Sequence, residues 1–216
     1  MVQFLLYHFL FYQITMKKVL ILLTSILFAM QMQAQDVTLL NRIREVNGKV
    51  KSFESDLANT MVKPKKTTTQ NGKLYFVMPY EFSAQFNTGN YMIVNAQRIK
   101  MDIGRFHGTF KLKDGGMMQG LSRIFLYGFQ GRIQDLANEN GYTVSTNTED
   151  GYHIITGTAK KKPLFGVGYK TVVFKYLTDS LLLKEIVLYD YNGNKDSYVI
   201  SNVKYDIPID KKTFQF

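Results

Sequence analysis

Most of this sequence alternates between apolar and polar residues with a period of two, in short segments separated by turn-forming residues. Because successive side chains of a strand point to opposite faces, each segment is predicted to form a half-buried β-strand. Pairs such as Asn71-Gly72 and Asn192-Gly193 between the segments are typical of hairpin turns. The predicted strands cover residues 53–61, 72–77, 80–86, 91–94, 98–103, 107–112, 142–146, 151–158, 171–177, 181–189 and 197–206.

Three segments depart from this period. Residues 36–52 carry apolar side chains at spacings of three and four, which predicts one amphipathic helix. Residues 117–138 are predicted to form one or two short helices, with a bend at Gly128 and Gly131. The basic, threonine-rich residues 63–70 are predicted to form an exposed hairpin connection.

These elements predict a mainly β (α+β) fold, in which a curled antiparallel sheet of about ten or eleven strands forms an incomplete β-barrel. A sheet with that many strands tends to curl or to close. The N-terminal helix and a mid-chain helical lid are expected to cover its open side. Residues 35–216 are therefore expected to form a single domain with an apolar interior.

The first 34 residues have the pattern of a secretory signal peptide that follows an additional apolar segment. Two lysines after Met16 precede the uncharged apolar run 19–30, and cleavage is predicted after Ala34. Residues 1–15 are interpreted as an over-long gene start, with Met16 as the true initiator; the alternative is a membrane-spanning tether. The protein is accordingly predicted to be exported to the periplasm, with its signal peptide cleaved.

The chain has no cysteine and a formal net charge of +10. The lack of cysteine rules out disulfides, thiolate metal sites and lipidation of the protein itself. Cleavage after Ala34 leaves 25 basic and 17 acidic residues, a net charge of +8. Such a charge favours an anionic membrane surface or acidic partners, or simply keeps the protein soluble. Nucleic acid is not an expected partner outside the cytoplasm.

Short motifs follow the first predicted helix in a fixed order. Residues 53–57 read FESDL, with a phenylalanine at the start of the first strand. Residues 72–79 read GKLYFVMP, a pattern of the form G-x-L-x-[apolar]-x-x-P. Residues 82–86 (FSAQF) and 91–95 (YMIVN) continue the series.

A second group of motifs lies near the end of the chain. Residues 190–194 (DYNGN) and 198–203 (YVISNV) form a predicted hairpin, and residues 209–216 read IDKKTFQF, of the form I-D-x-x-x-F-x-F. Together with the first group and the predicted signal peptide, this order resembles the LolA-type outer-membrane lipoprotein carrier family. The resemblance covers nearly all of the predicted mature chain.

The resemblance implies a periplasmic lipoprotein chaperone that binds acyl chains in a hydrophobic cavity. In the best-known members of the family, an arginine immediately before the proline is thought to latch the helical lid. In this chain Met78 occupies that position, so we expect the lid to be controlled differently. The related membrane-anchored receptor type is itself lipidated, and the missing cysteine argues against that type.

Alternation along the predicted strands gathers apolar side chains on one face of the sheet. We predict that this face binds acyl chains, with Phe82 near the mouth of the cavity. The alternative is that the same residues pack as an ordinary sheet–helix core. Abundant Met and Phe, which suit variable apolar ligands, favour the cavity. The predicted cavity residues are Leu74, Phe76, Met78, Phe82, Ala84, Phe86, Met92, Val94, Ile99, Met101 and Ile103.

The mid-chain insertion is nearly as apolar as the sheet, which fits a cover that exchanges contacts between sheet and ligand. Leu121, Ile124, Phe125 and Phe129 are the predicted lid residues, and a ligand is expected to displace them. Each methylene removed from water is worth about 0.8 kcal/mol, so a long acyl chain cannot cross an aqueous compartment readily without a carrier. Release at the destination requires that the chains are shielded incompletely.

No arrangement of residues in the sequence indicates catalysis. His107 and His153 lack a second ligand at a metal-binding spacing. Asp102 and Asp206 lie on predicted strands without a paired acid. The basic, glycine-containing segment 160–168 is interpreted as a hairpin loop rather than a phosphate-binding loop, with headgroup contact as an open alternative. The protein is predicted not to be an enzyme and to use no metal or cofactor.

The predicted function is that of a periplasmic carrier that shields lipoprotein acyl chains during transfer from the inner to the outer membrane. Its expected partners are acylated lipoproteins, an inner-membrane lipoprotein-releasing transporter and, transiently, the membrane surface. The protein is expected to act as a monomer. Two alternatives stay open: a carrier of the same fold for another lipid or apolar precursor, and a periplasmic sensor module that binds lipidated proteins.

Overall fold

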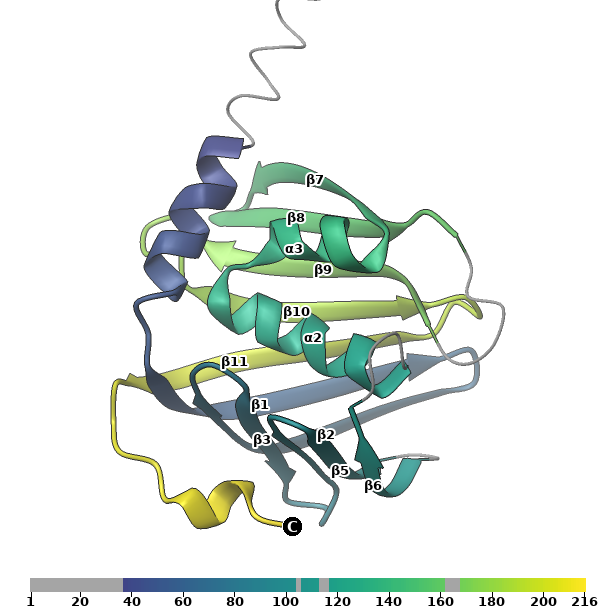
Figure 1. Cartoon of the computed structure of the whole chain (residues 1–216). Coiled ribbons are helices and arrows are strands. Elements are labelled where there is room, and N and C mark those ends of the chain that lie inside the picture. Colours follow the sequence, from purple (N-terminus) through teal and green to yellow (C-terminus); the bar gives the residue numbers. More distant parts are fainter. Residues whose placement is uncertain (1–36, 104–105, 113–116, 162–167) are drawn as a thin grey trace, which may run out of the picture. The chain divides into compact units, whose positions relative to one another are not determined.

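In a computed structural model of the chain, the described residues form eleven strands in a single antiparallel sheet (Figure 1). Residues 37–103, 106–112, 117–161 and 168–216 are described, so the predicted presequence and signal peptide lie outside them. From Leu40 onward the chain forms one compact unit. The strands are β1 (Ser52–Lys63), β2 (Lys66–Val77), β3 (Glu81–Phe86), β4 (Tyr91–Asn95), β5 (Arg98–Ile103), β6 (Phe106–Lys111), β7 (Tyr142–Glu149), β8 (Tyr152–Ala159), β9 (Tyr169–Leu177), β10 (Leu183–Asp190) and β11 (Lys195–Tyr205).

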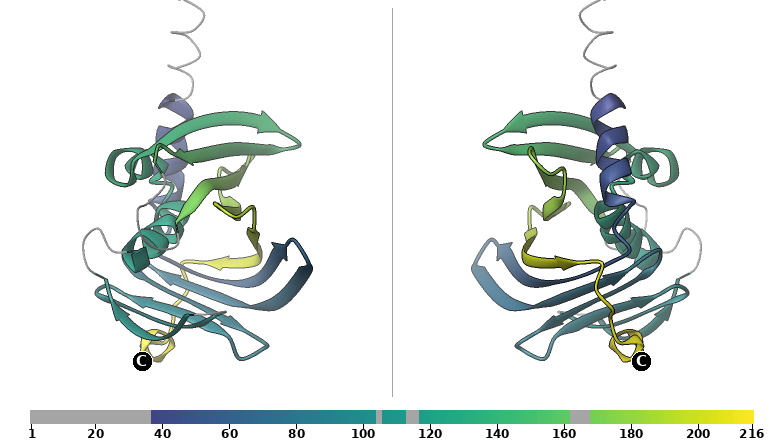
Figure 2. Two further views of the ribbon diagram at one scale, coloured as in Figure 1. Left: turned by 90° about the vertical axis from the view of Figure 1, so that its right-hand side faces the viewer. Right: turned by 90° about the vertical axis from the view of Figure 1, so that its left-hand side faces the viewer.

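Each strand pairs with the next strand in the sequence, except that β6 does not pair with β7. The order in the sheet is β6-β5-β4-β3-β2-β1-β11-β10-β9-β8-β7, so the first and the last strand pair at its centre. Helices α2 (Met117–Gln130) and α3 (Ile133–Asn140) connect the two unpaired edges. Figure 2 shows that the sheet is strongly curved and that α2 and α3 lie on one side of it. The predicted incomplete barrel with a helical cover is confirmed.

The hairpin β1–β2 is longer than the sequence predicts. The two strands stay paired as far as Lys63 and Lys66, so the connection is two residues long rather than the predicted 63–70. The hydroxyls of Thr60 and Thr69 form a hydrogen bond of 3.2 Å across the strands. Cross-strand threonine pairs stabilise a strand pair even where both faces are exposed. An exposed pair of strands does not need alternating apolar residues, which is why the period of two does not reveal it.

Within the described residues the first helix runs from residue 37 to residue 47, so it ends five residues before the predicted end at residue 52. The side-chain amide of Asn47 donates to the carbonyl groups of Ile43 and Leu181, both at 2.8 Å. Asparagine favours helix ends because its side chain replaces backbone partners that the helix no longer provides. These two bonds therefore fix the end of the helix against the turn before β10.

The mid-chain insertion forms two helices, as predicted, and the bend between them lies at Gly131. This residue has a φ of +65°, a conformation that glycine adopts without strain. A Cβ atom on Gly131 would also lie 2.6 Å from the Ile43 carbonyl oxygen of the first helix. The other glycine predicted at the bend, Gly128, instead lies within α2.

An aromatic cluster fills the space between α2 and the middle of the sheet. The ring of Phe129 lies 5.4–5.6 Å from the rings of Phe53, Phe76 and Phe82. The ring of Phe125 lies 5.5 Å from that of Phe82. Each of these five side chains is at most 5% exposed. Large aromatic side chains dominate core energetics, so α2 is a structural part of the core as well as a cover.

Candidate ligand-binding cavity

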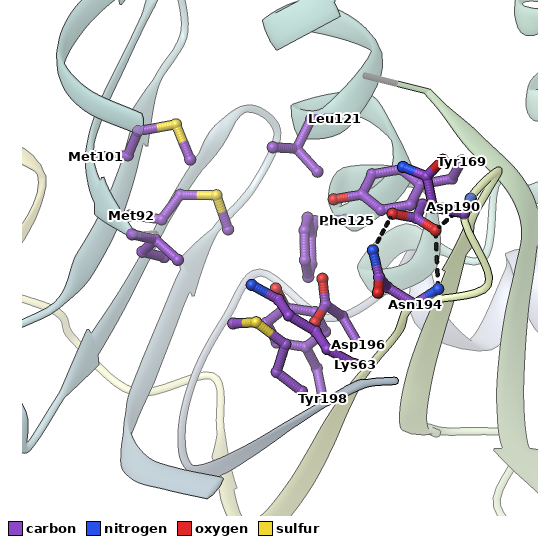
Figure 3. Close-up of a pocket in the computed structure, with 13 residues that line it drawn as sticks. Lys63, Met92, Met101, Leu121, Phe125, Tyr169, Asp190, Asn194, Asp196 and Tyr198 are labelled. Carbon is purple, nitrogen blue, oxygen red and sulfur yellow. Dashed lines mark hydrogen bonds between the residues drawn. The ribbon is translucent and has the colours of Figure 1, made fainter. Parts of the chain in front are cut away.

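A cavity of about 490 Å³ lies beside the N-terminal half of α2 (Figure 3). Such a volume falls within the range of about 300–1,000 Å³ that is typical of small-molecule sites. At roughly 30 Å³ per non-hydrogen atom, the share of a water molecule in the liquid, it holds about 16 such atoms, or one long acyl chain. Its lining residues are Met61, Lys63, Met92, Met101, Ile103, Leu121, Phe125, Tyr169, Asp190, Asn192, Asn194, Asp196 and Tyr198.

One wall of the cavity is apolar and comes from β4, β5 and α2. Met92 and Met101 are directly opposite each other on β4 and β5, and both are buried. Leu121 and Phe125 are four residues apart on α2, so they lie on the same face of the helix. Methionine is flexible and polarizable and therefore adapts to apolar ligands of variable shape.

The opposite wall is polar and comes from the hairpin that joins β10 to β11. The carboxylate of Asp190 accepts hydrogen bonds from the backbone N–H groups of Asn192 (2.8 Å) and Asn194 (2.9 Å). It also accepts one from the side-chain amide of Asn194, at 2.6 Å. The charge of Asp190 is therefore used to hold the turn, and Figure 3 shows this turn across the cavity from Met92 and Met101.

Asp196, at the start of β11, carries a carboxylate that the turn does not use. Its Oδ1 atom is shielded from solvent and accepts no hydrogen bond from the described residues. Burial raises the pKa of this carboxyl above its ordinary value; the Lys63 ammonium acts in the opposite direction, and Asp190 adds to the increase. A buried acceptor without a partner costs about 1–3 kcal/mol. The Asp196 side chain also lines the cavity, so a ligand's hydrogen-bond donor would reach this carboxylate through its other oxygen, Oδ2.

Met92, Met101 and Ile103 are the predicted cavity residues that line this cavity. The middle of the predicted site is instead occupied by Phe125 and Phe129 of α2, which leave a void of only about 10 Å³ there. At the centre of the sheet the alternative of an ordinary sheet–helix core thus describes the packing, and the cavity lies at one end. The predicted residues buried in the packed region are Leu74, Phe76, Phe82, Ala84, Phe86, Val94 and Ile99.

Two predicted residues lie in places that the sequence did not indicate. Phe82 is 0% exposed and contacts the rings of Phe125 and Phe129, so it is not near the mouth of the cavity. Alternation gives the face on which a side chain lies but not its depth along the sheet. Met78 follows the last residue of β2 and is partly exposed, with its N–H donating to the Lys51 carbonyl at 2.8 Å. Met78 lines neither the cavity nor the small void.

The four predicted lid residues divide into two groups. Leu121, in the N-terminal half of α2, lines the cavity, as does Phe125 one turn later, whose ring also belongs to the aromatic cluster. Phe129 belongs to the aromatic cluster, and Ile124 is buried without lining the cavity. The part of α2 that a ligand can displace at low cost is therefore its N-terminal half.

The C-terminal half of α2 is anchored to the sheet by two hydrogen bonds. The Tyr176 hydroxyl donates to the Gly128 carbonyl at 2.8 Å, and the Gln130 side chain donates to the Pro79 carbonyl at 2.5 Å. The backbone at Gly128 also lies close to the sheet, because a Cβ atom there would be 2.9 Å from the Phe174 ring. Any movement of α2 is therefore expected to pivot near Gly128.

We expect Tyr176→Phe to lower the free energy of unfolding by about 1–2 kcal/mol, because it removes a buried hydrogen bond to α2. Urea unfolding followed by circular dichroism measures this change. Tyr189→Phe is the matched control, since Tyr189 is 36% exposed and its loss of a hydroxyl is expected to cost less than about 0.5 kcal/mol. Equal stability of the two variants would show that the hydroxyl of Tyr176 does not anchor the helix.

The isolated polar residues of the sequence have structural partners. Asp102 and His107 face each other across β5 and β6, and the His107 Nδ1 atom lies 2.6 Å from an Asp102 carboxylate oxygen. Both side chains are about half exposed. The Nδ1 atom of His153 lies 2.8 Å from the Thr148 hydroxyl on the neighbouring strand. Asp206 accepts a hydrogen bond from a backbone N–H beside β1 at 2.7 Å. None of these contacts lies in the cavity.

Three further findings concern metal sites, the basic loop and membrane-spanning helices. Among the described residues, no group of three His, Asp or Glu side chains is arranged to hold a metal ion. The segment 160–168, with its alternative of headgroup contact, lies largely outside the described residues. No helix within the described ranges has the length and hydropathy that crossing a bilayer requires.

In sequence, the chain matches no family model and no curated protein. In structure, it is similar to a DUF1329 family protein from Desulfovibrio piger, with 15% identity, a TM-score of 0.45, and 82% of this chain and 95% of that chain covered. It is also similar to a LolA superfamily protein from Nitrosomonas europaea, with 10% identity and a TM-score of 0.42, and the match covers 84% of this chain and 97% of that chain. A third similar structure is the complex of Pseudomonas aeruginosa MucA and MucB, with 11% identity and a TM-score of 0.42, and the match covers 83% of this chain and 60% of that chain. At these TM-scores the similarities carry no weight for function.

Proposed function

We propose that this protein is a periplasmic carrier that shields the acyl chains of lipoproteins during transfer from the inner to the outer membrane. The observation that carries the proposal is the cavity of about 490 Å³ between the sheet and the N-terminal half of α2. Its apolar wall suits hydrocarbon. The motifs shared with LolA-type carriers and the predicted signal peptide support the same function.

The cavity explains how cargo is both held and released. It has room for about one long acyl chain, whereas a lipoprotein carries two or three. Further chains require the part of α2 that carries Leu121 and Phe125 to move away from the sheet. The contacts of these side chains with the sheet compete with the ligand, so the bound chains are shielded incompletely and can pass to an acceptor. The anchor at Gly128 keeps the rest of the helix in place.

A second candidate function is a carrier of the same fold for a single-chain lipid. The volume of the cavity favours it, because one chain fits without any movement of α2. In both cases the expected route is periplasmic. For the lipoprotein carrier the further partners are an inner-membrane lipoprotein-releasing transporter and, transiently, the membrane surface. No structural observation favours the third possibility, a sensor module.

Native mass spectrometry of the protein purified from the periplasm, followed by lipid extraction, tests the proposal. We expect bound acylated peptides, with one cargo molecule per protein. Recovery of a single-chain lipid without peptide would replace the first candidate by the second. Recovery of no bound lipid, together with no uptake of added acylated peptide by the purified protein, would contradict both.

A further inference from the structure

The cavity is lined by a carboxylate, that of Asp196, to which the described residues donate no hydrogen bond. The Oδ1 atom of Asp196 is shielded from solvent and receives no hydrogen bond within the part of the chain that the structure describes. Asp190 differs, because the turn that follows it supplies three hydrogen bonds to its carboxylate. Lys63, whose charge acts on Asp196, is exposed on the β1–β2 hairpin, where its ammonium group can remain hydrated.

This carboxylate does not help the ligand-free protein to fold. Burial disfavours its charged form, which raises the pKa of Asp196, and no described donor compensates for the loss of water. Residues that lower stability in this way are found preferentially at functional sites. A ligand that brings a hydrogen-bond donor, and above all a positive charge, would supply what the fold does not.

The other residues that line the cavity indicate the kind of molecule that carries this donor. Met92, Met101 and Leu121 lie across the cavity from the β10–β11 hairpin and present hydrocarbon (Figure 3). A ligand that satisfies both walls has an acyl chain on one side and a cationic donor on the other. The charged lining residues among those described are two carboxylates and one exposed ammonium, so an anionic head group would meet net repulsion.

We propose that the cavity binds an acylated ligand with a primary ammonium group at the base of its chain, and that Asp196 accepts a hydrogen bond from this ammonium. The inference rests on the proposed carrier function and specifies its cargo. For a lipoprotein, the base of the acyl chains is the modified N-terminal residue. The preferred cargo is therefore a diacylated lipoprotein whose N-terminal amine is free, rather than a triacylated one whose amine carries a third chain.

The test compares two synthetic lipopeptides that differ in one group: an S-diacylglyceryl-cysteine peptide with a free N-terminal amine, and the same peptide with that amine acetylated. Acetylation removes the charge and adds little volume. Affinities for the purified protein are measured by isothermal titration calorimetry. We expect wild type to prefer the free amine by about 10- to 100-fold, the usual effect of a charge-assisted hydrogen bond.

Asp196→Asn is expected to abolish this preference, so that the two peptides bind with about equal affinity. The affinity for the acetylated peptide is expected to be unchanged. Asp150→Asn is the matched control: it makes the same chemical change in the exposed β7–β8 turn, at a φ of +51° that asparagine tolerates. This control is expected to keep the wild-type preference. Thermal unfolding of ligand-free Asp196→Asn is expected at or above the wild-type temperature, which separates lost recognition from lost folding.

The possible failures are distinguishable. Equal binding of the two lipopeptides by wild type would overturn the role of Asp196 and leave the carrier function standing. A preference that persists in Asp196→Asn would assign the ammonium to another acceptor and also overturn it. Wild type that binds neither lipopeptide would contradict the lipoprotein carrier function and, with it, the inference.

Discussion

We expect the Phe82→Glu variant to lose its cooperative unfolding transition at room temperature, because the new carboxylate would be buried in the aromatic cluster. Phe82 is 0% exposed, and its ring lies 5.5 Å from Phe125 and 5.6 Å from Phe129. Removing a buried phenylalanine side chain costs about 3–5 kcal/mol, and burying an unpaired charge costs more. The expected loss of about 5 kcal/mol or more is comparable to the whole stability of a typical domain.

Near-UV and far-UV circular dichroism of the purified variant measure this loss. Phe82→Leu is the control: it keeps an apolar side chain at the site and is expected to cost less than about 2 kcal/mol, leaving a folded protein. A Phe82→Glu variant that folds normally but no longer binds acyl chains would restore the prediction from the sequence, in which Phe82 lies near the mouth of the cavity.

Most strands could be predicted because one face of the sheet is buried. Where this holds, as for Leu74 and Phe76 on β2, alternation marks the strand and the buried face together. It does not hold at the far end of β1 and β2, where residues 62–69 are exposed on both faces. There the pairing depends on cross-strand contacts such as Thr60 with Thr69, which a sequence pattern does not show.

The apolar wall of the cavity could be predicted in part. Met92, Met101, Leu121 and Phe125 were identified because strand and helix periods assign each side chain to a face. The period carries no information on which part of that face is filled. That depends on where the Phe125 and Phe129 rings meet the sheet, which is a result of tertiary packing.

The polar wall of the cavity was not predicted, although the position of Asp196 in the sequence is unusual. Tyr198 and Ile200 are buried on the inner face of β11, and Asp196 lies two residues earlier on the same face. A charged residue that continues an apolar stripe is an unusual feature of a strand. Its significance depends on the pairing of β1 with β11, which brings Met61 and Lys63 to the same cavity from a distant part of the chain.

Leu121→Glu is expected to weaken the binding of acyl chains by about 100-fold or more while leaving the protein folded. Leu121 lines the cavity and is only partly buried, so a carboxylate at this position can remain hydrated in the ligand-free protein. When an acyl chain enters, the same carboxylate must lose its water against hydrocarbon, which costs several kcal/mol. The cost therefore falls on binding rather than on folding, the reverse of what is expected at Phe82.

Calorimetry with the N-acetylated diacyl lipopeptide measures the effect, because that ligand has no N-terminal ammonium that the new carboxylate could attract. Leu121→Met is the control, since it preserves the volume and the apolar character of the side chain and is expected to bind nearly as wild type does. Thermal unfolding of both variants should agree with wild type within a few degrees. Undiminished affinity of Leu121→Glu would mean that acyl chains do not contact the N-terminal half of α2. In that case the helix would be only a structural cover, and the chains would have to enter the barrel by another route.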